Sequence, residues 1–157
     1  MKKLLIILIL FTGFNAFSQK NYDDTLDGMA QIKEAVAKAK AENKQVLVQV
    51  GGNWCKYCIQ LHDFMEHDID IKNKIDKYYV YINVNYSEEN RNYETMKLLN
   101  FPQRFGFPSL HIVGNDGRML NNQGVENLSN EENFDKTKIL KYLDLWTVFK
   151  MNPVQYK

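Results

Sequence analysis

The chain has 157 residues, of which 45% are hydrophobic and 25% are charged, values that are ordinary for one globular domain. Its 20 basic and 19 acidic side chains give a formal net charge of +1, without the basic excess that binding to nucleic acid or an anionic membrane surface normally requires. Nine Phe, nine Tyr and two Trp supply enough bulky apolar surface for a core, which argues against global disorder.

The N-terminus has the pattern of a cleavable signal peptide. Two lysines precede an uninterrupted apolar run over residues 4–11, and residues 16–18 place small side chains at the positions that signal peptidase requires. The run is well short of the roughly 20 residues that span a bilayer, which disfavours a permanent membrane anchor. We therefore expect residues 1–18 to be a signal peptide and residues 19–157 to be one domain in the periplasm or otherwise exported, with no stable membrane insertion after cleavage.

The remaining chain alternates between helical and strand patterns in a single block. Helices are predicted over residues 27–43, from near Cys55, over 68–77, over 88–100, and after Asp135, which can cap the last one. Strands are predicted over residues 45–50 and 78–84 and as a hairpin of 110–113 with 118–120, followed by a polar loop over 121–133. This order predicts an α/β fold in which a mixed sheet is covered by helices on both faces.

The chain has two cysteines, Cys55 and Cys58, which follow a predicted strand and open a predicted helix. At a helix N-terminus, unpaired backbone N–H groups and the helix dipole stabilise a thiolate, so the pKa of Cys55 should fall below the free value of about 8.5. Lys56 adds a positive charge nearby, and Trp54 would flank the sulfur. We therefore expect Cys55 to attack a partner's disulfide and Cys58 to resolve the mixed disulfide that forms.

Two other interpretations of the cysteine pair stay open. A structural disulfide fits an exported chain, although so small a loop gains little stability from chain entropy. A copper site could use Cys55, Cys58 and His62, whose spacing can place them on one helix face, and would make the chain a non-catalytic binding module. His67 and His111 have no ligand-like spacing and are interpreted as structural or surface residues.

The wider pattern resembles the thioredoxin superfamily over residues 27–149. A strand, a loop, WCxxC and a helix are followed about fifty residues later by Gly106-Phe107-Pro108, which enters a strand, and by an Asn-Asp-Gly hairpin. The stretch AKAENKQVLVQVGGNWCKYC is similar to exported bacterial thioredoxin-like proteins related to the C-terminal domain of DsbD. The resemblance implies a thioredoxin fold and a thiol–disulfide oxidoreductase that needs no organic cofactor and no metal.

The resemblance also implies a role for each matching residue. Cys55 matches the exposed nucleophile, Cys58 the more buried resolving thiol, and Pro108 the cis-proline that faces the sulfurs. A cis bond there would leave the backbone of Phe107 free to pair with an extended substrate strand. The expected catalytic residues are therefore Cys55 and Cys58, and the expected substrate-binding residues are Trp54, Lys56, Tyr57, Phe107 and Pro108.

Two positions depart from the thioredoxin pattern. Thioredoxins usually carry a buried Asp six residues before the first Cys and a Lys on the next strand, where this chain has Gln49 and Tyr81. An amide does not titrate and tyrosine has a reference pKa near 10, so neither side chain can shuttle a proton near neutral pH. Water, His62 and Glu66 are the candidates to accept the proton of Cys58.

The expected partners are proteins that carry disulfides or thiols, together with a membrane electron donor that keeps the pair reduced. The reducing or isomerising direction is implied by the resemblance to reducing exported relatives. The dipeptide Lys56-Tyr57 stands where the family often has Gly-Pro. The direction of electron flow therefore cannot be inferred from this dipeptide by analogy with the family. Nothing in the sequence demands an oligomer, and we expect a monomer.

Overall fold

A four-stranded sheet in the order β2–β1–β3–β4 forms the centre of the computed structural model, which describes residues 20–130 and 133–157. The strands are β1 (Gln45–Gly51), β2 (Tyr79–Asn85), β3 (Ser109–Val113) and β4 (Met119–Gly124). β1 pairs in parallel with β2 and antiparallel with β3, which pairs antiparallel with β4, so the sheet is mixed as predicted. The expected signal peptide, residues 1–18, lies outside the described residues.

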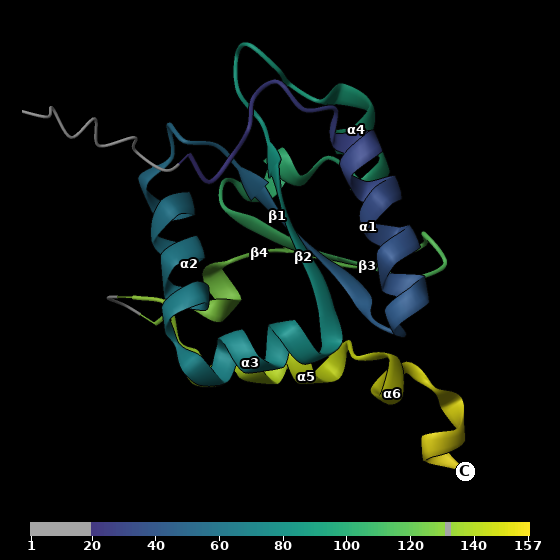
Figure 1. Cartoon of the computed structure of the whole chain (residues 1–157). Coiled ribbons are helices and arrows are strands. Elements are labelled where there is room, and N and C mark those ends of the chain that lie inside the picture. Colours follow the sequence, from purple (N-terminus) through teal and green to yellow (C-terminus); the bar gives the residue numbers. More distant parts are fainter. Residues whose placement is uncertain (1–19, 131–132) are drawn as a thin grey trace, which may run out of the picture.

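Helices cover both faces of this sheet (Figure 1). They are α1 (Gly28–Glu42), α2 (Lys56–His67), α3 (Ile69–Tyr78), α4 (Tyr93–Leu98), α5 (Lys136–Leu145) and α6 (Val148–Met151). α1 and α4 pack on one face, while α2, α3 and α5 pack on the other. Within residues 20–130 and 133–157, no helix combines the length and the apolar character needed to cross a bilayer.

β1 is buried along its whole length and supplies both cores. Its side chains alternate between the two faces, as in any strand, so Val46, Val48 and Val50 join the core under α1. Leu47 points to the opposite core, under α2, α3 and α5. Gln49 falls on the same face as Leu47, which places one buried polar side chain beside the start of α2.

The helix predicted over residues 27–43 is present as α1. The Asp27 carboxylate accepts hydrogen bonds from the N–H groups of Met29 and Ala30, which satisfies two donors at the helix start. Asn43 ends the helix in the left-handed conformation, a common way to close a helix. Local sequence signals were therefore sufficient for this element.

The helix predicted over residues 88–100 is shorter in the structure and begins only at α4. Asn92, just before it, has a positive φ of 44°, which interrupts a helix. The side chain of Asn90 donates to the carbonyls of Asp24 and Leu26, far away in the sequence. These long-range contacts hold the chain before α4 in a loop, so the N-terminal part of the prediction was wrong.

The polar loop predicted over residues 121–133 is partly a strand. β4 continues to Gly124, which pairs with Ser109 of β3. β4 lies at the edge of the sheet, where polar side chains are tolerated because one side of the strand faces away from the other strands. Because the residues from Asn121 onward are polar, the sequence pattern predicted a loop where β4 continues.

The last predicted helix begins as expected but is divided. Asp135 caps α5 by accepting from the N–H of Lys138. The helix ends at Leu145, and α6 is a separate turn that leaves Phe149 exposed. Phe149 therefore adds nothing to the core under α5.

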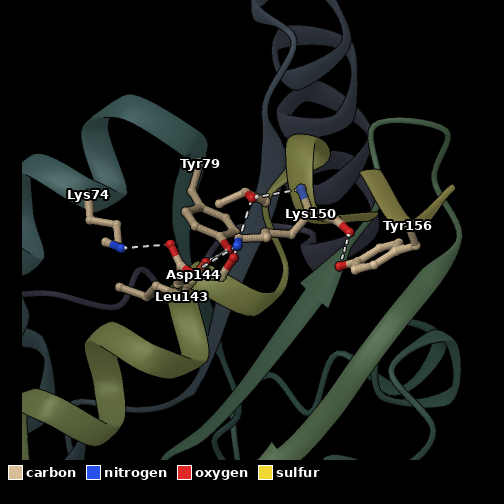
Figure 2. Close-up of polar contacts among 7 residues, drawn as sticks. Lys74, Tyr79, Leu143, Asp144, Lys150 and Tyr156 are labelled. Atoms are coloured by element: carbon tan, nitrogen blue, oxygen red, sulfur yellow. Dashed lines mark hydrogen bonds and ion pairs between the residues drawn. The ribbon is translucent and has the colours of Figure 1, made fainter. Parts of the chain in front are cut away.

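Polar contacts hold the end of α5 to α3 and β2 (Figure 2). Lys74 Nζ lies 3.1 Å from the Asp144 carboxylate. The hydroxyl of Tyr79 donates to the carbonyl of Leu143, and burial raises the pKa of Tyr79. This hydroxyl satisfies a carbonyl that the end of the helix leaves without an intrahelical partner.

His111 is a fully buried side chain of β3. Its Nε2 lies 2.9 Å from the Ser109 hydroxyl, and its Nδ1 has no hydrogen-bond partner among the described residues. Burial, with a smaller effect from Arg104, lowers the pKa of His111 to about 3. The folded protein therefore keeps this imidazole neutral at pH values where the unfolded chain protonates it.

We predict that His111 makes the protein less stable as the pH falls below the usual histidine pKa of 6.5. Between about pH 6 and 4, His111 is protonated in the unfolded chain and neutral in the folded protein. This difference lowers the free energy of unfolding by about 1.4 kcal/mol for each pH unit of acidification. Urea denaturation should show this slope in the wild type and lose it in His111→Gln. The exposed His67, changed to Gln, serves as the control, and an unchanged slope in His111→Gln would contradict the prediction.

Candidate active site

Cys55 and Cys58 form a disulfide where β1 leads into α2. Cys55 is the N-cap of α2, and its Sγ accepts a hydrogen bond from the backbone N–H of Cys58 at 3.2 Å. Cys55 is 7% exposed and Cys58 is 0% exposed, so Cys55 is the more accessible sulfur. In the reduced protein the same N–H can stabilise a thiolate on Cys55, as the helix position predicted.

Gly51, the last residue of β1, makes room for the buried cysteine. A Cβ at this position would lie 2.5 Å from Cys58 Sγ and 3.0 Å from the Tyr22 hydroxyl oxygen. The distance to the sulfur is shorter than real Cβ contacts, and the distance to the hydroxyl is at their short limit. The absence of a side chain at Gly51 thus allows Cys58 to pack directly against the end of the central strand.

The predicted cis peptide bond between Phe107 and Pro108 is present. The ring of Phe107 packs against the cluster that contains both cysteines. It also meets Trp54 edge-on at 5.6 Å and stacks on Tyr86 at 5.0 Å between ring centroids. Trp54 is held in place because its Nε1 donates to the Tyr86 carbonyl at 2.7 Å. These three rings form an aromatic wall beside the disulfide.

Two hollows in the surface border the WCKYC turn. One, of about 540 Å³, is lined by Trp54, Tyr86, Ser87, Glu88, Glu89 and Arg91. The other, of about 350 Å³, is lined by residues that include Lys56, Tyr57 and Phe134. Trp54 is 60% exposed and Tyr57 is 65% exposed, so both offer apolar surface to a partner. Of the predicted substrate-binding residues, Trp54, Lys56 and Tyr57 are thus exposed beside the disulfide, whereas Phe107 is half-buried against the cysteines and Pro108 is buried.

Gln49 stands at the centre of a buried polar network behind Cys58. Its Nε2 donates to the Cys58 carbonyl at 2.9 Å and also to the Tyr22 hydroxyl. Its Oε1 accepts from the Tyr81 hydroxyl at 2.7 Å. The two positions at which the chain departs from thioredoxins, 49 and 81, are thus in direct contact as a neutral pair.

The sequence analysis missed Tyr22, which is fully buried against the two cysteines. Asn53 ties its backbone down on both sides: the Tyr22 N–H donates to Asn53 Oδ1 at 3.2 Å, and Asn53 Nδ2 donates to the Tyr22 carbonyl at 2.6 Å. Tyr22 precedes the first predicted element, and the residues next to it do not have the apolar spacing of a helix or a strand. No local signal could have placed it at the site.

In the described part of the chain, no hydrogen bond joins the side chain of either candidate proton acceptor to the Cys58 sulfur. His62 Nδ1 lies 3.2 Å from the Tyr81 hydroxyl and 3.1 Å from Asn83 Nδ2, and burial lowers the pKa of His62. Glu66 instead pairs with Lys72 at 3.2 Å. These contacts give neither side chain a direct link to the sulfur in the disulfide form, and their part in proton transfer stays a prediction.

The alternative copper site is not assembled either. Across residues 20–130 and 133–157, no three His, Cys, Asp or Glu side chains gather in a way that could hold a metal ion. His62, the third proposed ligand, has its Nδ1 directed to Tyr81 and Asn83.

We predict that Gly51→Ala destabilises the oxidised protein by about 1–3 kcal/mol, because the new methyl group overlaps Cys58 Sγ within a packed core. Chemical denaturation of the oxidised form measures the loss. Gly124→Ala is the matched control: there the obstructing atoms belong to the flexible carboxylate of Glu126, which can swing away. Equal losses in the two variants would show that the close approach to Cys58 has no special cost.

Comparison with known proteins agrees with this geometry. One similar solved structure is a disulphide isomerase from Xylella fastidiosa Temecula1, with 25% identity and a TM-score of 0.68 over 78% of this chain and 93% of that one. Another is a DsbH oxidoreductase, with 19% identity and a TM-score of 0.55 over 76% and 82%. The C-terminal domain of Neisseria meningitidis DsbD in the oxidised form is also found, with 18% identity and a TM-score of 0.49 over 74% and 94%.

A comparison with curated proteins gives no match. A family model described as a thioredoxin-like domain matches residues 32–137, more than half of the chain. That match includes β1, the two cysteines, the cis-proline and the whole sheet. The chain belongs to the thioredoxin-like domain family.

Proposed function

We propose that this protein is an exported thiol–disulfide oxidoreductase whose Cys55–Cys58 pair exchanges electrons with cysteines of partner proteins, in the reducing or isomerising direction. The observation that carries the proposal is the asymmetry of the pair. Cys55 Sγ receives a backbone N–H at the start of α2, while Cys58 is completely buried behind it. One sulfur is therefore suited to attack and the other to resolve.

The reaction begins with the reduced pair. The Cys55 thiolate attacks one sulfur of the partner's disulfide, and a mixed disulfide forms as the partner's other sulfur leaves as a thiolate. Cys58 then attacks Cys55, which closes the intramolecular disulfide and releases the partner's second sulfur. Two electrons pass to the partner, and no cofactor takes part in the exchange.

The partner's chain is proposed to bind beside the cis-proline. The cis bond before Pro108 belongs to the loop that enters β3, next to the cysteines. An extended segment can pair with the backbone there and rest its side chains on Trp54 and Phe107. Lys56 and Tyr57 border the same turn on its other side. These five residues are thus proposed to bind substrate.

The general activity has independent support. The chain is a thioredoxin-like domain with a CxxC disulfide, and a solved structure 25% identical to it is described as a disulphide isomerase. Each turnover in the reducing direction oxidises the pair, so a second partner must reduce it again. For an exported protein we propose a membrane electron donor, with the domain of residues 19–157 acting as a monomer after its signal peptide is removed.

We predict that Cys55→Ser reduces insulin-disulfide reduction to the uncatalysed rate, because the attacking sulfur is gone. Cys58→Ser should instead accumulate mixed disulfides with partner proteins, since the resolving sulfur is missing. Non-reducing electrophoresis followed by mass spectrometry detects these adducts. The double variant is the control and should capture nothing. Full activity in Cys55→Ser would refute the mechanism.

The direction of electron flow predicts a low reduction potential for the pair. A reductant should lie near thioredoxin, at about −270 mV, whereas a value near that of DsbA, about −120 mV, would indicate an oxidant. Equilibration in dithiothreitol or glutathione buffers, with alkylated thiols counted by mass, measures the potential. The oxidising value would reverse the proposed direction and leave the exchange chemistry intact.

A further inference from the structure

Among residues 20–130 and 133–157, no hydrogen bond joins the sulfur of the resolving cysteine to an ionisable side chain that could help it to lose its proton. Cys58 is fully buried, and burial raises the pKa of a thiol because a thiolate is poorly solvated there. The backbone N–H that could stabilise a thiolate points to Cys55 instead. The strand position that would carry an acid is Gln49. Some other group must therefore stabilise the Cys58 thiolate when it resolves the mixed disulfide.

The contacts of Gln49 fix the orientation of its amide. A carbonyl oxygen can only accept, so the Cys58 carbonyl requires the amide nitrogen on its side. The amide oxygen then accepts from the Tyr81 hydroxyl, and the second N–H of the amide is the donor to Tyr22. Exchanging the nitrogen and oxygen would place the amide oxygen of Gln49 against the carbonyl oxygen of Cys58, and both atoms can only accept.

This orientation leaves the hydrogen of the Tyr22 hydroxyl unused. The oxygen of Tyr22 accepts from Gln49, and its own O–H has no acceptor among the hydrogen bonds of the described residues. Cys58 Sγ lies on the same side of Gly51, since both atoms are within 3.0 Å of the point where a Cβ on Gly51 would sit, and the two form no hydrogen bond in the disulfide form. Tyr22 also packs in one cluster with the two cysteines. In the described part of the chain, a hydroxyl that donates to no acceptor thus shares a buried cluster with the Cys58 sulfur.

We propose that in the reduced protein the Tyr22 hydroxyl donates a hydrogen bond to the Cys58 thiolate and so favours the resolving step. This inference rests on the proposed function. The step is balanced without a proton from Tyr22: Cys58 Sγ bonds to Cys55 Sγ, the bond from Cys55 to the partner breaks, and the proton of the Cys58 thiol ends on the released partner thiol. Tyr22 only lowers the cost of charge on Cys58.

The surroundings keep Tyr22 suited to this role. Burial raises the pKa of Tyr22 well above its usual value, so the hydroxyl stays protonated at every pH at which the enzyme would work. The two hydrogen bonds with Asn53 hold its backbone in place. The titratable groups linked to it are the two cysteines, which share its cluster, and Tyr81, which shares Gln49 with it. His62 contacts Tyr81, and Asp63 and Glu66 act on Tyr81 from α2.

The test is a titration of Cys58 in the reduced protein, with Cys55→Ser in the background so that one thiol titrates alone. The Cβ resonance of ¹³C-labelled cysteine follows its ionisation. Tyr22→Phe keeps the ring and removes the hydroxyl, and should raise the pKa of Cys58 by about one unit, a loss of about tenfold in thiolate at neutral pH. With Cys55 restored, the midpoint of the pH dependence of the resolving rate should be higher in Tyr22→Phe by the same amount.

Tyr81→Phe is the matched control, because it removes the other hydroxyl on Gln49 without changing a neighbour of the sulfur. It should leave the Cys58 titration in place. An unchanged midpoint in Tyr22→Phe, or an equal shift in Tyr81→Phe, would overturn the proposal.

A second measurement avoids the substitution of Tyr22 altogether. In the Cys55→Ser protein, the ¹³Cζ resonance of Tyr22 should move with the same midpoint as Cys58, while that of exposed Tyr57 should not. A Tyr22 resonance that ignores the ionisation of Cys58 would overturn the proposal. Neither titration uses a partner protein, so failure of the proposed function would appear separately, as a wild-type protein that reduces no disulfide.

Discussion

The close approach of Cys58 to the backbone of Gly51 is the constraint on which the rest of the site depends. It joins the end of the central strand to the first turn of α2 without a side chain between them. The buried sulfur therefore lies at the end of β1, next to the face that carries Gln49. The accessible sulfur of Cys55 then falls at the helix N-terminus, where a backbone N–H reaches it. The difference between the two thiols is thus a consequence of where one strand stops.

Features with a local cause could be predicted from the sequence. β1 is a short run rich in valine, α1 has Asp27 as its cap, and the cysteines stand at a strand–helix junction. The conformation of Pro108 and the pairing of positions 49 and 81 came from the resemblance to thioredoxins. In these cases the residues that decide the structure lie close together in the chain or in a familiar pattern.

Features with a distant cause could not be predicted. Tyr22 is held at the cysteines by distant residues, among them Asn53, which lies 31 residues away and bonds its backbone. The start of α4 is delayed by contacts between Asn90 and the N-terminal segment, and β4 is a strand because β3 pairs with it, despite its polar side chains. His62 has the spacing of a ligand, yet its ring contacts β2. Tertiary contacts override local preference in each case.

The segment of residues 20–27 has a consequence for how the protein can be shortened. It contains no strand and no helix, so a domain defined by its regular elements would begin at α1. Such a truncated chain would keep the whole sheet and both sulfurs but lose the Tyr22 side chain that packs against the two cysteines. The asparagines that hold the segment, Asn53 and Asn90, would lose their partners as well. The smallest functional unit of this protein therefore begins before its first regular element.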